Sequence, residues 1–72
     1  MYTAAVITIS TSCARGERTD TSGTNLVSIL KSDGYDVIYN SIVSDDKEQI
    51  KNELIKLVNE NINLILTTGG TG

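Results

Sequence analysis

The 72-residue sequence contains no histidine, no tryptophan and no phenylalanine, and it has one cysteine. Without histidine, no Ser-His or Cys-His pair can activate a nucleophile. A single cysteine cannot form an internal disulfide, and no zinc-binding spacing can be built around Cys13. The shortage of cysteine favours a reducing, cytoplasmic location. Three tyrosines are too few aromatic residues to predict a surface on which nucleic-acid bases stack.

Basic residues and long apolar runs are scarce as well. Six Lys and Arg residues against nine Asp and Glu residues give a formal net charge of −3, and the basic residues are scattered. Because a nucleic-acid partner requires a clustered basic surface, we expect none. The longest apolar run is far too short to cross a membrane, and residues 1–3 supply no basic region of the kind that begins a signal peptide. Length and composition therefore predict one small domain without a membrane segment.

Three short apolar runs predict three strands, over residues 4–9, 35–43 and 64–68. In the first run (AAVITI) the apolar residues do not alternate with polar ones, so this strand is expected to be buried on both faces. Helical stripes of apolar residues between the runs predict helices over about 22–32 and 46–61. The predicted stripes are Leu26, Ile29 and Leu30 with Val27 beside them, and Ile50, Leu54, Leu57 and Val58.

The order of these elements is β-α-β-α-β, with a long polar loop expected over residues 10–21 and a helix stop at Gly34. Strands separated by helices pair in parallel through right-handed crossovers, which predicts an α/β fold with three αβα layers. We expect strand order 2-1-3, with 1-2-3 as the alternative. In the order 2-1-3 the helices cover opposite faces, and ligands usually bind beyond the carboxyl ends of the first and third strands.

Three polar segments follow the predicted strands, at residues 10–12, 44–46 and 69–72. In a parallel sheet these segments lie at the same edge. The segment 69–72 (GGTG) permits unusual backbone angles and lets an anion approach backbone N–H groups, so it is a candidate phosphate-binding loop. The alternative is a tight turn that needs glycine for its geometry alone. The segment is neither a Walker loop nor a dinucleotide-binding fingerprint.

Asp45 is the strongest candidate for an acidic functional residue, because it could bind Mg²⁺ or hydrogen-bond a polar heterocycle. Its spacing from Glu48 is also that of an N-terminal capping box, and spacing alone favours the cap. The residues before the first predicted helix are interpreted as its N-terminal cap. A contact with a ligand is the alternative. These residues are Asp20, Thr21 and Ser22.

Cys13 follows the first strand, where some phosphoryl-transfer enzymes carry a nucleophilic cysteine. The phosphatase pattern places Cys and Arg six positions apart, whereas Arg18 is five positions from Cys13 and Arg15 is nearer still. A cysteine phosphatase or phosphocarrier is therefore the weakest of the functional hypotheses.

Five segments in the same order resemble the Mog/MoaB family of molybdenum-cofactor biosynthesis domains. They are AVITIS (5–10), RGERTDTSG (15–23), GYDV (34–37), IVSDDKEQI (42–50) and LILTTGGTG (64–72). The resemblance implies adenylylation of molybdopterin, in which ATP and molybdopterin react with Mg²⁺ to give adenylyl-molybdopterin and pyrophosphate. It also implies a cytoplasmic homotrimer or hexamer and a partner protein that later inserts molybdate.

The resemblance assigns roles to particular residues. Asp45 matches the acidic residue implicated in pterin handling and catalysis, and Ser10 and Thr11 match the pocket edge after the first strand. The loop that contacts phosphate and nucleotide is matched by Thr68, Gly69, Gly70, Thr71 and Gly72. The family often has Asp where Thr11 stands, which bears on a ligand contact, and Pro where Ser44 stands.

Family members continue past the glycine loop with a segment that carries a second essential Asp. Residues 1–72 are therefore expected to be the N-terminal part of one molybdopterin-binding domain, catalytically incomplete by themselves. The same motifs occur in fused and gephyrin-like scaffold proteins. A non-catalytic pterin- or nucleotide-binding module thus stays open as the alternative to an adenylyltransferase.

Overall fold

Strands and helices alternate over residues 2–69, the part of the chain that the computed structural model describes. In chain order the elements are β1 (Thr3–Ile9), α1 (Thr11–Ala14), α2 (Thr21–Ser32), β2 (Asp36–Val43), α3 (Lys47–Asn59) and β3 (Leu64–Gly69). The candidate phosphate-loop residues Gly70, Thr71 and Gly72 lie outside the described residues. Within residues 2–69, no helix has the length and apolar character needed to cross a bilayer.

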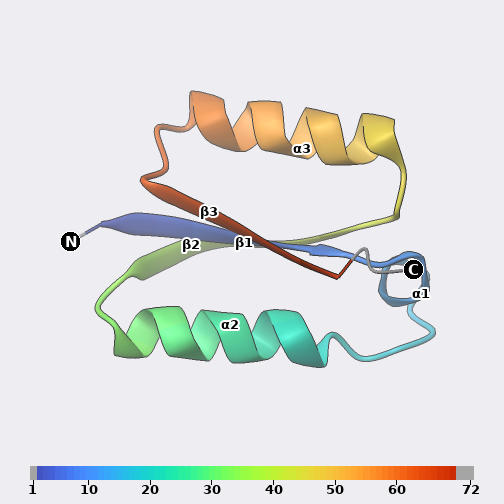
Figure 1. The fold of residues 1–72 in the computed structure, drawn as a ribbon, viewed down its shortest axis with the longest axis horizontal. Helices are drawn as coiled ribbons and strands as arrows, with labels where there is room; N and C mark the ends of the chain where they lie inside the picture. The colour runs from blue at the N-terminus through green and yellow to red at the C-terminus, as the bar shows by residue number, and fades with distance from the viewer. Residues whose placement is uncertain (1, 70–72) are drawn as a thin grey trace.

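Strand β1 lies at the centre of a three-stranded parallel sheet with the order β2-β1-β3. Both the α/β class and the preferred strand order are therefore confirmed. Helix α2 covers one face of the sheet and α3 covers the other (Figure 1). Because β1 is paired on both sides and covered on both faces, Ala4, Ala5, Val6 and Ile7 are 0% exposed. The prediction that this apolar run forms a strand buried on both faces is thus confirmed.

Each face of β1 contributes to a separate apolar cluster. On the α2 side, Ala4 and Val6 pack with Leu30, and Leu26 and Val27 complete the helix contact. On the α3 side, Ala5 and Ile7 pack with Leu57, which is fully buried. The alternation of side chains along a strand separates these two sets, so β1 joins the two halves of the core.

A β-bulge between Ala4 and Ala5 shifts the register against β2, so that Val37 lies opposite Ala4 and Tyr39 lies opposite Ala5. Residues two apart on a regular strand share a face. Here Val37 packs in the α2 cluster and Tyr39 packs in the α3 cluster. The extra residue, Ile38, is left 43% exposed at the bulge. The bulge therefore places Val37 and Tyr39, which are two residues apart, on opposite faces of the sheet.

The predicted apolar stripes are correct in part. Ile29 is 56% exposed and Val58 is 62% exposed, so neither belongs to the buried face of its helix. In α2 the buried residues are Gly23 and Leu30, and a Cβ on Gly23 would overlap the Thr8 hydroxyl of β1. Apolar identity at helical spacing predicted the stripes, but the angle at which each helix packs decides which neighbouring residue is covered.

The long loop expected over residues 10–21 is wrong for its first part, because Thr11–Ala14 form the single-turn helix α1. The Ser10 side chain caps this turn by accepting a hydrogen bond from the Cys13 N–H at 3.3 Å. A turn of four polar and small residues has no apolar stripe, so periodicity could not reveal it. The helix stop predicted at Gly34 is confirmed, since Gly34 follows the C-cap of α2 with φ +91°.

Candidate functional site

An open cleft of about 660 Å³ lies beyond the carboxyl ends of β1 and β3. A parallel sheet brings the segments that follow its strands to one edge, and β2-β1-β3 order makes this edge the predicted switch point. The structure brings five of the predicted site residues together in the lining of this cleft. They are Ser10, Thr11, Asp45, Thr68 and Gly69.

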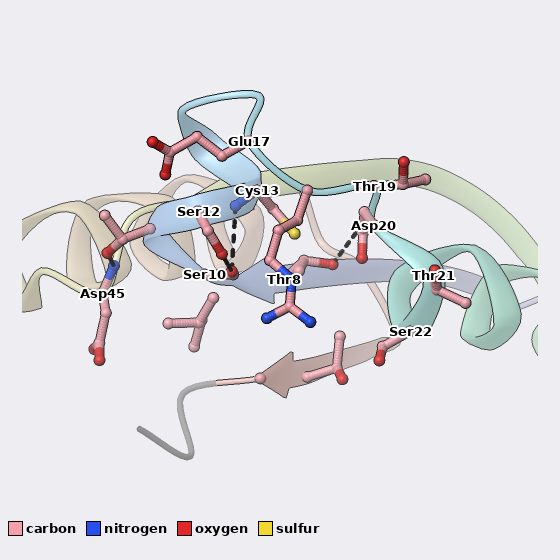
Figure 2. Close-up of a pocket in the computed structure, with 15 residues that line it drawn as sticks. Thr8, Ser10, Ser12, Cys13, Glu17, Thr19, Asp20, Thr21, Ser22 and Asp45 are labelled. Atoms are coloured by element: carbon pink, nitrogen blue, oxygen red, sulfur yellow. Dashed lines mark hydrogen bonds between the residues drawn. The ribbon is translucent and has the colours of Figure 1, made fainter.

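The segment after β1 forms the centre of the cleft wall. The Ser10 backbone N–H donates to the Val43 carbonyl oxygen at 2.9 Å, which ties the end of β1 to the end of β2. The Ser10 hydroxyl lies 3.2 Å from the Ser12 hydroxyl and caps α1 through Cys13 (Figure 2). These contacts fix a short row of hydroxyl groups at the sheet edge.

Asp45 lies at one end of the cleft, opposite the end formed by Thr21 and Ser22 (Figure 2). Its backbone N–H donates to the Thr11 hydroxyl at 3.2 Å, so the first turn of α1 holds the turn that carries Asp45. Thr11 therefore has a structural role at the position where the family often has Asp.

The capping interpretation of Asp45 is wrong. Helix α3 begins after Asp46, which is its N-cap and forms no side-chain capping bond. The first turn is instead tied back by Gln49, whose side-chain oxygen accepts from the Ser44 N–H at 3.3 Å. Asp45 is exposed, and its carboxylate takes part in no hydrogen bond or ion pair among residues 2–69. This carboxylate is therefore available to a ligand.

Asp20 is the opposite case, and here the predicted cap is confirmed. One carboxylate oxygen accepts from the Gly23 N–H at 2.9 Å, as an N-cap does. The other accepts from the hydroxyl of Thr8 at 2.8 Å, and Thr8 is only 3% exposed (Figure 2). A Cβ on Gly23 would overlap both the Asp20 carboxylate and the Thr8 hydroxyl, so this junction requires glycine.

Strand β3 supplies the remaining side of the cleft. Thr68 pairs with Thr8 and Gly69 pairs with Ile9, which sets the last two residues of β3 beside the end of β1. Gly69 has φ +89°, and a Cβ there would overlap the Ile9 carbonyl oxygen. Close backbone approach and a left-handed conformation thus both require glycine at this position.

The cleft has further lining residues that the sequence did not single out as ligand contacts, among them Thr8, Glu17, Arg18 and Thr19. All except Thr8 belong to the polar stretch between β1 and α2. A long polar segment after a central parallel strand was the available signal, because that segment must begin at the ligand-binding edge. Within residues 2–69 no group of three or more acidic or Cys side chains is arranged to hold a metal ion.

This arrangement, a doubly wound parallel sheet with a polar cleft at its carboxyl edge, has close matches among known proteins. Residues 5–72 match the family described as a probable molybdopterin binding domain, and the chain belongs to this family. The resemblance expected from the five sequence segments is thereby confirmed.

Individual relatives agree with this assignment. The chain is 40% identical over 67 residues to the molybdopterin adenylyltransferase of Pyrococcus furiosus, a match that covers 93% of this chain and 39% of that protein. It is 41% identical over 68 residues to molybdenum cofactor biosynthesis protein B of Bacillus cereus, with the same two coverages. The solved structure of the molybdopterin biosynthesis enzyme MoaB from Thermus thermophilus superposes with a TM-score of 0.90 at 35% identity, covering all of this chain and 46% of that one. The chain thus spans about two fifths of the length of these two relatives.

Proposed function

We propose that the protein acts in molybdenum cofactor biosynthesis, where it binds molybdopterin and ATP in the cleft and transfers the adenylyl group to molybdopterin. The observation that carries the proposal is the family match over residues 5–72, which spans every segment that lines the cleft. Adenylyl transfer is supported by the name of the Pyrococcus furiosus relative. In this reaction an oxygen of the acceptor attacks the α-phosphorus of ATP, and the bond to pyrophosphate breaks.

The chemistry requires neutralisation of phosphate charge and in-line positioning of the reactants more than a covalent nucleophile. A site without histidine is compatible with that requirement. The polar lining offers hydroxyl donors from Ser10, Thr11 and Thr68. We assign Ser10 and Thr11 to the substrate-binding edge after β1, and Thr68 to the phosphate side together with the glycine segment 69–72.

Mg²⁺ in such sites is commonly held by one or two carboxylates together with substrate phosphates. Among the residues described, Asp45 fits this role, since its carboxylate has no protein partner. Asp20 does not fit, because both of its oxygens accept hydrogen bonds within the fold. When bound, the ion would neutralise phosphate charge. Asp45 is accordingly the residue that we assign to catalysis.

We further propose that residues 1–72 form the N-terminal part of a longer molybdopterin-binding domain, since the relatives are about two and a half times as long. We also propose that the full-length protein forms a homotrimer or hexamer in the cytoplasm. Another protein then inserts the metal into the product. A domain that binds molybdopterin without turnover is the alternative, and the assay below distinguishes it.

The decisive experiment incubates the full-length protein that contains residues 1–72 with ATP, Mg²⁺ and molybdopterin and measures adenylyl-molybdopterin and pyrophosphate. We expect Asp45→Asn to lower turnover by about 100-fold or more, the scale of losing one electrostatic group at a phosphoryl centre. Asp46→Asn is the matched control, because Asp46 is the adjacent exposed carboxylate and does not line the cleft. Equal turnover in the two variants would reject the role of Asp45, and tight molybdopterin binding without any product would favour the binding module.

A further inference from the structure

The cleft lining is strongly unbalanced in charge. It contains the three carboxylates of Glu17, Asp20 and Asp45 and a single basic side chain, that of Arg18. Formal charges therefore sum to −2 before any ligand binds. A phosphate group that enters such a cleft is repelled unless a cation faces it. Arg18 is the basic side chain in the lining that can compensate the phosphate charge.

No other basic residue of the described chain lines this cleft. Arg15 is in the same connection between α1 and α2 but does not line it. The positive end of the α2 dipole gives little help, because the Asp20 carboxylate already occupies the first turn. Arg18 itself forms no ion pair within residues 2–69, where Lys56–Glu53 is the pair observed. Its guanidinium is therefore free to bind a ligand.

The backbone on both sides of Arg18 is held in place. The Glu17 N–H donates to the Ser12 carbonyl oxygen at 2.9 Å, which ties the preceding residue to α1. Asp20, two residues further on, is bound to Thr8 of the central strand and to Gly23 of α2. A long side chain on a backbone anchored at both ends loses less freedom on binding, and the planar guanidinium can contact two phosphate oxygens at once.

We propose that Arg18 binds a phosphate group of the substrate in the cleft that Asp45 also lines. This inference rests on the proposed function and extends it to a residue outside the assigned site. Arg18 is a binding residue in this scheme: it lowers the dissociation constant of a phosphate-bearing ligand and leaves the fold unchanged.

The test measures binding of three probes by calorimetry: ATP, inorganic pyrophosphate and molybdopterin. The proteins are the full-length wild type and its variants Arg18→Gln, Arg18→Lys and the control Arg15→Gln. Charge-assisted hydrogen bonds of this kind change affinity by about 10- to 100-fold, so Arg18→Gln should weaken at least one probe by that factor. Arg18→Lys should recover part of the loss because it restores the charge without the planar fork. Arg15→Gln should change affinity less than about twofold, since exposed charges away from the ligand are screened by salt.

The pattern of losses identifies the phosphate concerned. A loss for ATP and pyrophosphate supports contact with the nucleotide phosphates, and a loss for molybdopterin alone supports contact with a phosphate of the pterin. Unchanged binding in Arg18→Gln, or equal losses in Arg18→Gln and Arg15→Gln, would overturn the inference while leaving the proposed function standing. If wild type binds neither ATP nor molybdopterin, the proposed function fails and the inference fails with it. Unaltered thermal unfolding of each variant confirms that the fold is intact.

Discussion

The starts of the two long helices carry the same residue type and use it in opposite ways. At the start of α2, both oxygens of Asp20 accept hydrogen bonds, from Gly23 and from the buried Thr8. At the start of α3, neither Asp45 nor the N-cap Asp46 forms a side-chain bond within the described chain, and the turn is held through the backbone N–H of Asp45. A satisfied carboxylate stabilises the fold, whereas an unsatisfied one at the rim of a cleft is available for chemistry.

The largest effect on stability is expected from Asp20→Ala. The variant loses an N-cap, worth about 1 kcal/mol, and leaves the buried Thr8 hydroxyl without its acceptor, which costs a further 1–3 kcal/mol or so. Urea denaturation should therefore show a loss of about 2–4 kcal/mol in the free energy of unfolding.

The matched control for this prediction is Asp46→Ala, which removes the other N-cap aspartate. Because Asp46 makes no side-chain capping bond, the loss should stay below about 0.5 kcal/mol, within the usual range of surface substitutions. Equal losses in the free energy of unfolding from the two substitutions would show that the hydrogen bonds of Asp20 add no stability beyond that of an N-cap residue without them.

A smaller loss is expected from Gly23→Ala, which tests the same junction from the helix side. The added methyl group would overlap the Asp20 carboxylate and the Thr8 hydroxyl, so either these side chains shift and lose their hydrogen bond or α2 moves away from β1. Overpacking of this kind costs about 1–3 kcal/mol, even though alanine is the better helix former. Thermal unfolding checks this, with Asn25→Ala on the exposed side of α2 as the control that should be neutral or stabilising.

The smallest effect on stability should come from Thr11→Val, which removes the acceptor for the Asp45 backbone N–H. One partly exposed hydrogen bond contributes about 1 kcal/mol or less. Under the catalytic role proposed for Asp45, turnover of the full-length protein should fall about 3- to 10-fold, more than the loss of stability suggests, because Asp45 is no longer held in position. Thr11→Ser keeps the hydroxyl and should restore turnover. Failure of the serine variant to restore it would mean that the Thr11 methyl group, and not the hydrogen bond, matters here.

Much of the fold could be predicted from the sequence. The run AAVITI predicted the central strand, and the alternation of strands and helices predicted three parallel strands in the order β2-β1-β3. The short helix α1 could not be predicted in this way, because its stability comes from the Ser10 cap and not from an apolar face. Ile29 and Val58 fit their helical stripes but lie outside the buried faces, since identity and spacing do not specify how a helix is rotated against the sheet.

For the site, topology alone predicted that residues 10–12, 44–46 and 69–72 would meet, because every loop that follows a parallel strand begins at the same edge. Of the last segment, Gly69 is among the described residues and lines the cleft. The roles of Ser10, Thr11, Thr68 and the glycine segment came from the family resemblance and stay proposals. Arg18 stands in an unmatched phosphatase pattern and in the segment RGERTDTSG, and neither assigns it a ligand. Its place in the cleft depends on how residues 15–20 fold between α1 and α2, and that path has no periodic pattern to predict it.

The sequence by itself determined the elements that depend on local pattern. A β-branched run makes a strand and an apolar stripe makes a helix, and the β-α-β connections then leave few topologies to choose from. Only the tertiary structure decided which aspartate is bound within the fold and which is free. Asp20 and Asp45 both precede helices in polar segments, and local spacing even favoured a cap at each. The difference arises because Thr8, twelve residues before Asp20, is buried on the central strand and donates a hydrogen bond to the Asp20 carboxylate, whereas no donor of the described chain is hydrogen-bonded to the Asp45 carboxylate. A hydrogen bond between distant residues depends on how the elements pack, which spacing along the chain does not encode.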